Sequence, residues 1–230
     1  MTDSHSRDSL SLPSLAARRP TSAGASEVAI SPHTTHQLRT LALVGQAGCG
    51  KTTLAEGLLA AAGAIQAPGS VERGSTVCDY LPLEKSAGHS LQLAVASMEF
   101  DGTRIHLLDA PGSPDFLGHT LPALSAVETV AVVLNAHHGI EPTALRMMEH
   151  AARLDLDRLI VVNQIDAANA DLEGLLARIQ EVFGKECLPV NLPAAGATRV
   201  SDCFFAPDGE SDFSSVSQAH QELIDQVVEV

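Results

Sequence analysis

The chain has 230 residues, 45% of them hydrophobic, and a formal net charge of −14 at pH 7. This length and composition predict one ordinary domain with an appendage and exclude a wholly disordered chain. The acidic balance argues against direct DNA binding and against non-specific nucleic-acid binding. The four cysteines form no C-x-x-C pair, which argues against structural zinc and favours a reducing compartment, so a cytoplasmic protein is expected. Apolar runs are far shorter than the roughly twenty residues that span a bilayer, so no membrane association is expected.

The first segment, residues 1–37, is rich in Ser, Thr, Pro and Ala and has no sustained periodicity. Such a segment cannot bury enough apolar surface to offset its ordering entropy, so a disordered N-terminal leader is predicted. Residues 9–26 lack acidic side chains and carry two arginines, as an organelle transit peptide does. Asp3 and Asp8 favour a plain tail instead.

From residue 38 onward, short apolar segments alternate with helical patterns. That alternation predicts an α/β fold with a mostly parallel sheet and helices on both faces. Asp101-Gly102 lies between two apolar segments and is a strong hairpin signal, so one strand pair should be antiparallel. Strands are expected at 40–45, 92–99, 104–109, 129–135 and 158–163.

Two helices are predicted near the end of the chain. Apolar residues recur at helical spacing from Leu172 to Phe183, and Gly184 supplies a stop signal. The apolar pattern predicts that this face of the helix packs in the core and is not a functional site. Ser215 and Gln218 resemble a capping box that opens a final helix.

Residues 45–52 read G-Q-A-G-C-G-K-T, directly after an apolar segment and before a helical one. Glycines let backbone N–H groups face phosphate oxygens, and the positive end of the following helix favours anions. Lys51 would reach the outer phosphates and Thr52 would offer a hydroxyl to Mg²⁺. The segment therefore predicts a nucleoside triphosphate site rather than a plain Gly-rich turn. Its candidate binding residues are Gly45, Gln46, Ala47, Gly48, Cys49, Gly50, Lys51, Thr52 and Thr53.

A second candidate segment, Asp109-Ala110-Pro111-Gly112-Ser113, ends the predicted strand 104–109. Ligands of open α/β sheets bind at the carboxyl ends of strands, so these residues should lie beside the first segment. Asp109 could hold Mg²⁺ through water. The Gly112 N–H could sense a γ-phosphate and couple it to movement of the next segment. An ordinary turn is the alternative interpretation.

A third candidate segment, Asn163-Gln164-Ile165-Asp166, ends the predicted strand 158–163. The Asp166 carboxylate could accept both N1–H and N2–H₂ of guanine, a donor pair that adenine lacks. A site built for guanine would leave this carboxylate unpaired against adenine, which predicts selectivity for guanine. Alternatively, Asp166 merely caps the next helix.

These three segments resemble the first, third and fourth sequence boxes of translational GTPases, and the sequence between them resembles elongation factor G. Asp109 to Phe116, for example, resembles the D-T-P-G-H-x-D-F segment of that family. The likeness covers about residues 38–230 and favours the divergent elongation-factor-G-like branch. It implies a Ras-like P-loop G domain, GTP and GDP with Mg²⁺ as ligands, GTP hydrolysis, and the ribosome as partner.

The resemblance also implies a division of the chain. A G domain would occupy residues 38–186. Residues 187–230 would begin an inserted α+β subdomain, with strands near 187–193 and 201–206 and the chain ending before the last G motif.

Three positions depart from the family pattern. Ser113 stands where the family has the histidine that positions the attacking water, so hydrolysis should be slow without an activator. Ser90 stands at the switch I threonine and keeps its hydroxyl. Gln164 replaces a lysine whose ammonium bonds the phosphate loop, so that contact should be lost and affinity should be weaker. The resemblance makes Lys51, Gly112 and Ser113 the candidate catalytic residues and Thr52, Ser90 and Asp109 the candidate Mg²⁺ ligands.

Alternative functions remain open at this point. Ser113 and Gln164 also fit a nucleotide-binding module without turnover. A P-loop ATPase or small-molecule kinase is a further alternative, which the predicted hairpin and Asp166 oppose. His89 could replace the missing catalytic histidine, although an isolated loop histidine is more often merely exposed. Cys49 is either a small filler or a reactive thiol with a lowered pKa near a helix N-terminus.

Overall fold

The computed structural model describes residues 33–229. Residues 1–32 of the predicted leader lie outside this range. Its last residues differ from the prediction, because Thr35–Gln37 form the 3₁₀ turn η1 and lead directly into strand β1 (Leu38–Val44). The Gln37 side chain accepts a hydrogen bond from the Thr34 amide at 3.0 Å, which stabilises this turn.

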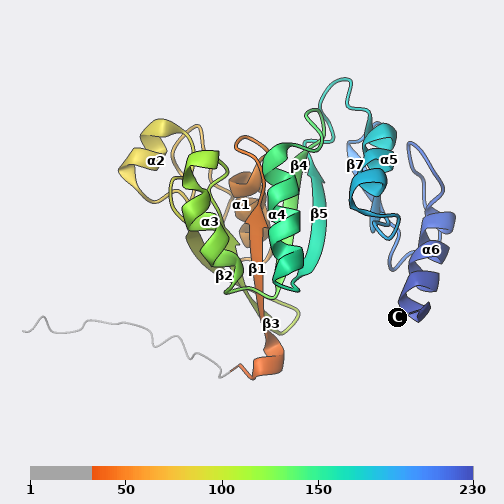
Figure 1. The fold of residues 1–230 in the computed structure, drawn as a ribbon, viewed down its shortest axis with the longest axis horizontal. Helices are drawn as coiled ribbons and strands as arrows, with labels where there is room; N and C mark the ends of the chain where they lie inside the picture. Colours follow the sequence, from red (N-terminus) through yellow and green to blue (C-terminus); the bar gives the residue numbers. More distant parts are fainter. Residues whose placement is uncertain (1–32, 230) are drawn as a thin grey trace, which may run out of the picture. The chain divides into compact units, whose positions relative to one another are not determined.

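The main sheet has five strands in the spatial order β2-β3-β1-β4-β5 (Figure 1). β1, β3, β4 and β5 run parallel, and β2 pairs antiparallel with β3 through the Asp101-Gly102 turn. The predicted mostly parallel α/β sheet with one antiparallel pair is therefore confirmed. Strand bounds agree with the predicted ones to within two residues: β2 (Ala94–Phe100), β3 (Thr103–Asp109), β4 (Thr129–Asn135) and β5 (Asp157–Asn163).

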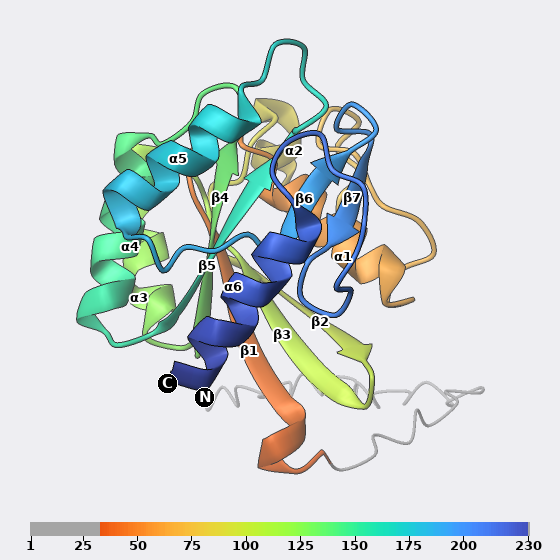
Figure 2. The ribbon, with the colours of Figure 1, turned by 90° about the vertical axis from the view of Figure 1, so that its right-hand side faces the viewer.

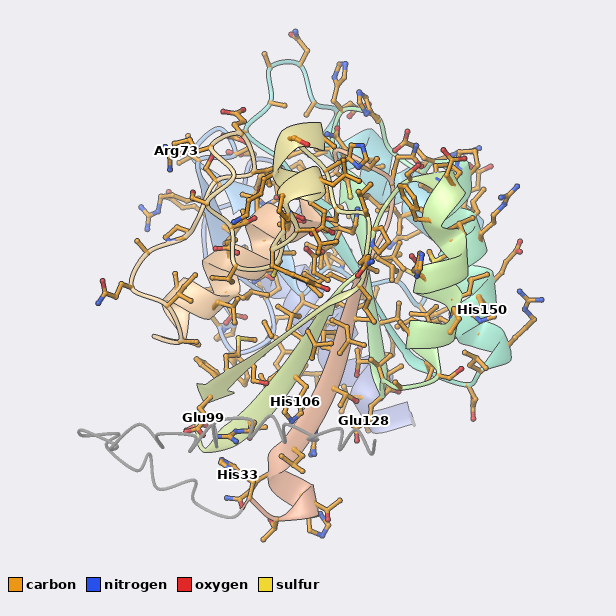
Figure 3. All side chains as sticks on the ribbon, turned by 90° about the vertical axis from the view of Figure 1, so that its left-hand side faces the viewer. His33, Arg73, Glu99, His106, Glu128 and His150 are labelled. Carbon is orange, nitrogen blue, oxygen red and sulfur yellow. The ribbon has the colours of Figure 1, made fainter. Side chains whose placement is uncertain are left out.

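Charged residues gather at the closed end of the β2–β3 hairpin (Figure 3). Arg104 donates to Glu99 Oε1 at 2.6 Å, and His33 Nε2 lies 3.4 Å from the same oxygen. The hydrogen bond from Arg104 holds the pKa of Glu99 below its usual value. This exposed cluster lies at the end of β3 opposite to Asp109, so it is remote from the candidate site.

Helices cover both faces of the main sheet, each over its own apolar cluster. Helix α1 (Lys51–Ala61) packs on one face of the sheet, and the apolar cluster between them includes Leu43. Ala42 and Val44 belong to the opposite cluster, because successive side chains of a strand point to opposite faces. That second cluster includes residues of α3 (Leu117–Leu124), α4 (Pro142–Arg153) and α5 (Leu172–Phe183).

The last part of the chain forms a smaller unit with its own core (Figure 2). β6 (Asn191–Ala194) and β7 (Arg199–Asp202) pair antiparallel and pack against α6 (Val216–Glu229). The core of this unit contains Leu192, Cys203, Val216 and Ala219.

The predicted bounds of these last strands were wrong. The segment 187–190 is not extended as a strand, and β7 ends before residues 203–206. The Asp202 carboxylate accepts the amides of Phe204 and Phe205 at 2.7 and 3.0 Å, which turns the chain out of the sheet.

The two predicted helices are confirmed. α5 occupies the predicted residues and ends at Gly184. The Gln218 amide donates to Ser215 Oγ at 3.4 Å, which is half of the expected capping box at α6. Among the described residues, none of the helices combines the length and apolarity needed to cross a bilayer.

Candidate functional site

The first candidate segment forms a tight loop between β1 and α1. Gly50 has a left-handed φ of 89°, and a Cβ at this position would collide with the side-chain amide of Asn163. Only glycine therefore fits this close approach. Lys51 begins α1 and is 6% exposed, and its ammonium donates to the Gln46 carbonyl at 2.8 Å. The lysine thus folds back over the loop that precedes it.

Asp109 lies at the end of β3 against this loop, as predicted. Thr52 Oγ1 donates to Asp109 Oδ2 at 2.7 Å, whereas Asp109 Oδ1 is buried without a hydrogen-bond partner. Burial raises the pKa of Asp109 to about 6, and the nearby Asp79 and Glu56 add to the rise. The hydrogen bond from Thr52 and the charge of Lys51 act in the opposite direction. Burial of a carboxylate oxygen without a partner is unfavourable, and a cation bound at Oδ1 would supply that partner.

Ser90 extends the same network from a different part of the chain. Its Oγ lies 3.2 Å from Thr52 Oγ1 and donates to Asp79 Oδ1 at 2.7 Å. The other oxygen of Asp79 accepts from Thr76 Oγ1 at 3.1 Å. The three predicted Mg²⁺ ligands therefore lie together, and Asp79 joins them.

Gly112 of the second candidate segment packs against the loop formed by the first candidate segment, residues 45–52. A Cβ on Gly112 would lie 2.6 Å from the Ala47 nitrogen and would collide with the Lys51 ammonium. Ser113 follows, and its Oγ accepts from the Asp115 amide at 3.4 Å as the cap of the 3₁₀ turn η2 (Pro114–Phe116). The Ser113 hydroxyl is thus engaged with its own turn.

The third candidate segment is bonded to the loop by two amide side chains. Asn163 Nδ2 donates to the Cys49 carbonyl at 2.9 Å, and Gln164 Nε2 donates to the Gly48 carbonyl at 3.4 Å. The expected loss of the contact between position 164 and the loop was therefore wrong, because a glutamine amide replaces the ammonium as donor. Asn135 at the end of β4 donates to Gln164 Oε1 and so orients that amide.

Asp166 is exposed at one side of a cavity of about 540 Å³. Residues from α1 and from the third segment form one wall of the cavity, and residues of the β6–β7 hairpin form another. The lining consists of Gly50, Thr53, Asn163, Gln164, Ile165, Asp166, Ala197, Thr198, Arg199 and Val200.

Two minor predictions concerned single side chains. Of the two interpretations of Cys49, the structure favours the small filler: the side chain is buried, and burial raises the pKa of the thiol despite the nearby Lys51. His89 is exposed, with its ring centroid 6.4 Å from that of Phe116 in η2. It therefore lies next to the segment that follows Gly112.

Sequence reasoning missed three residues that organise the site. Asp79 accepts from Ser90, and Asn135 orients Gln164. Glu56 in α1 is fully buried and accepts the amides of Gly69 and Val77 at 2.8 and 2.6 Å. A glutamate on the apolar side of a helix was the available signal for Glu56. The other two lie in segments that resemble the family, but no local pattern assigns them a role in the site.

Comparison with known proteins gives a consistent result. Residues 36–230 match the family model described as elongation factor Tu GTP binding domain. An elongation factor G-like protein of Mycobacterium tuberculosis is 34% identical over 203 residues, which cover 84% of this chain and 28% of that protein. The tetracycline resistance protein TetW of Butyrivibrio fibrisolvens is 34% identical over 149 residues, 64% of this chain and 23% of that protein.

Solved structures agree. A crystal structure of a Thermus thermophilus protein superposes with a TM-score of 0.75 and 35% identity, covering 84% of this chain and 31% of that one. The chain thus spans less than a third of the length of each of these relatives. Because the family model covers most of the chain, and because the fold and the three loop segments agree with it, the chain belongs to the family of elongation factor Tu GTP-binding domains.

Proposed function

We propose that this chain binds GTP and GDP with Mg²⁺ and hydrolyses GTP, as the switch domain of a translation factor resembling elongation factor G. The observation that carries the proposal is that the second and third candidate segments are both hydrogen-bonded to the first. Thr52 is bonded to Asp109, and both Asn163 and Gln164 are bonded to loop carbonyls. Family membership and the elongation factor G-like relative support the same function.

The residues at the proposed metal site fit Mg²⁺. Thr52 Oγ1 donates to Asp109 and Ser90 Oγ donates to Asp79, and the two hydroxyl oxygens lie 3.2 Å apart. Both hydroxyl oxygens can donate lone pairs to a cation, and Asp109 Oδ1 is a buried acceptor without a partner. Hard oxygen donors of this kind suit Mg²⁺. When bound, the ion would neutralise the charge of the outer phosphates.

The other residues have separable roles in the proposal. The loop amides from Gly45 to Thr53 and the Lys51 ammonium would hold the phosphates. The Gly112 N–H would contact the γ-phosphate, and Asp166 would accept the guanine N–H groups. Gly112 packs against the loop 45–52 and immediately precedes the turn that Ser113 caps. A contact between a γ-phosphate and the Gly112 N–H would therefore act directly on the position of this turn.

Hydrolysis should be slow without an activator. The Ser113 side chain is shorter than the histidine that the family has at this position, so it cannot make the same contact with the attacking water. The loss of one transition-state contact typically lowers the rate by about 10² to 10³. The ribosome is the proposed activator and partner, in agreement with the name of a relative, the mitochondrial ribosome-releasing factor 2 of Culex quinquefasciatus, 33% identical over 156 residues.

A second candidate function is nucleotide binding without turnover. The engagement of Ser113 with its own turn favours it specifically. Turnover assays with and without ribosomes distinguish the two. GTP hydrolysis stimulated by ribosomes selects the enzyme, and GTP binding without hydrolysis in their presence selects the module.

The first test is a titration with fluorescent GDP and Mg²⁺, followed by competition with unlabelled GTP or ATP. Displacement by GTP but not by ATP is expected. Lys51→Ala should abolish binding, whereas Lys85→Ala removes an equal charge from an exposed position in α2 (Pro82–Ala87) and should not. Equal displacement by ATP would instead indicate a P-loop ATPase or kinase.

A further inference from the structure

The turn between β6 and β7 is held in an unfavourable backbone conformation. Ala195, Gly196 and Ala197 have successive left-handed φ values of 54°, 67° and 59°. Alanine avoids this region, because its Cβ approaches the carbonyl oxygen. Strained residues of this kind persist only where their surroundings fix them, and they gather at functional sites.

Asp212, in the loop before α6, fixes this turn. Its two carboxylate oxygens accept the amides of Gly196 and Ala197 at 2.9 and 2.7 Å. Thr198 Oγ1 closes the turn by donating to the Ala195 carbonyl at 2.7 Å. The position of the next residues, 197–200, is therefore well determined relative to the small C-terminal core.

Residues 197–200 face the candidate nucleotide site. They line the cavity of about 540 Å³ together with Gly50, Thr53 and the loop 163–166. This volume lies within the range of about 300 to 1,000 Å³ that is typical of small-molecule pockets. One wall of the cavity thus carries the proposed guanine-reading residues, and the hairpin forms another.

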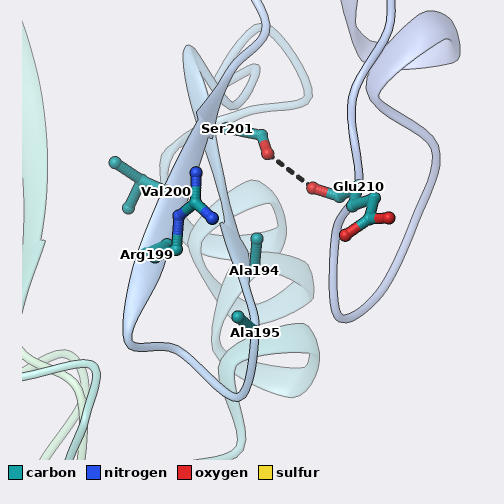
Figure 4. Close-up of a pocket in the computed structure, with 6 residues that line it drawn as sticks. All are labelled: Ala194, Ala195, Arg199, Val200, Ser201 and Glu210. Carbon is teal, nitrogen blue, oxygen red and sulfur yellow. Dashed lines mark hydrogen bonds between the residues drawn. The ribbon is translucent and has the colours of Figure 1, made fainter.

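The chemistry of the hairpin wall suits a nucleotide. Arg199 and Val200 follow one another on β7 and are both exposed, with their side chains on opposite sides of the strand, as Figure 4 shows in a close-up of a second pocket beside this hairpin. Val200 is 59% exposed, which leaves its side chain available to a planar ring. No Lys or Arg follows Arg199 in this chain of net charge −14, so Arg199 is one of few permanent positive charges in this unit.

We propose that the β6–β7 hairpin is a wall of the nucleotide pocket, with Val200 packing against the purine and Arg199 opposing the negative charge of the nucleotide. Asp212 is then a positioning residue, since it holds the turn without lining the cavity. The proposal rests on the proposed function, because a guanine nucleotide must occupy the cavity beside Asp166.

A single tryptophan tests the contact directly, because the chain has no tryptophan. In Val200→Trp, addition of Mg²⁺ and GDP should change the tryptophan fluorescence, with a midpoint equal to the dissociation constant from fluorescent-GDP competition. The matched control is Phe205→Trp, which places the same probe at a position of the same unit that is 83% exposed and outside the cavity lining. Its fluorescence should not change.

The outcomes separate the two proposals. GDP binding without a fluorescence response of Trp in Val200→Trp overturns the hairpin proposal alone. Failure of the unsubstituted chain to bind GDP overturns the proposed function and the hairpin proposal together. Val200→Trp could keep its circular dichroism spectrum but lose GDP binding, while Phe205→Trp still binds GDP. That result would support the proposal, because it would show that a larger side chain at position 200 blocks the pocket.

A charge reversal tests the role of Arg199 independently. Arg199→Glu should weaken GDP binding about tenfold, because it replaces an attraction with a repulsion next to the ligand. Arg178→Glu makes the same change of net charge on the exposed surface of α5 and should alter affinity less than about twofold. Equal affinities of the two variants would contradict the proposal.

Discussion

Asp109, a proposed Mg²⁺ ligand, should destabilise the folded protein when no cation is bound. Its pKa rises from 3.8 to about 6 because burial disfavours the charged form. The folded state therefore binds the proton more tightly than the unfolded state, so stability is highest at low pH and falls as pH rises from 3.8 through about 6. The interval is about two pH units at about 1.4 kcal/mol each, which gives about 3 kcal/mol at neutral pH.

Asp109→Asn should remove this cost. An amide oxygen can still accept from Thr52, so the variant without nucleotide should be about 2 to 3 kcal/mol more stable at pH 7.5. At pH 5 the gain should be roughly half as large, since the wild-type carboxyl is then mostly protonated in the folded state. Urea unfolding at the two pH values, in the absence of Mg²⁺ and nucleotide, measures both quantities.

A charge-matched control isolates the effect of burial. Asp157→Asn removes a carboxylate from an exposed position at the start of β5 and should change stability by less than about 0.5 kcal/mol. If Asp109→Asn destabilises the protein, or stabilises it equally at both pH values, the reasoning about the unpartnered carboxylate is refuted.

Two further changes test how the site is held together. Glu56→Ala removes the acceptor of the Gly69 and Val77 amides, so trypsin should cleave after Arg73 at least about tenfold faster, while Glu56→Gln should show a smaller effect; unchanged cleavage in both would show that the carboxylate does not fix this segment. Gly112→Ala places a Cβ 2.6 Å from the Ala47 nitrogen, so GTP binding should weaken more than GDP binding relative to the unsubstituted chain; an unaltered ratio of the two affinities would argue against sensing through Gly112.

Much of the fold followed from local signals in the sequence. Asp101-Gly102 specified the antiparallel pair because few residue pairs adopt the two positive φ values of such a turn, here 46° and 72°. The phosphate-type loop was also recognisable, since its glycines, Lys51 and Thr52 are contiguous. Gly184 marked the end of α5 for a similarly local reason.

Other features depend on contacts between distant segments. Asp79 and Asn135 act through Ser90 and Gln164, and no spacing in the sequence indicates either pair. The β6–β7 turn opposes the propensity of its alanines, because Asp212 compensates for the strain. The bounds of β6 and β7, the strands on either side of this turn, were therefore predicted incorrectly.

The alternation of core residues along the central strands restricts how this domain can change in length. In β4, Val132 and Leu134 face the helices α3 and α4, while Ala131 and Val133 face α1. Deleting one codon inside this strand would exchange the two sets for the residues beyond the deletion, so each face would receive side chains that do not match the space there. Insertions and deletions should therefore be tolerated only in the connections between strands, where an extra residue changes no face.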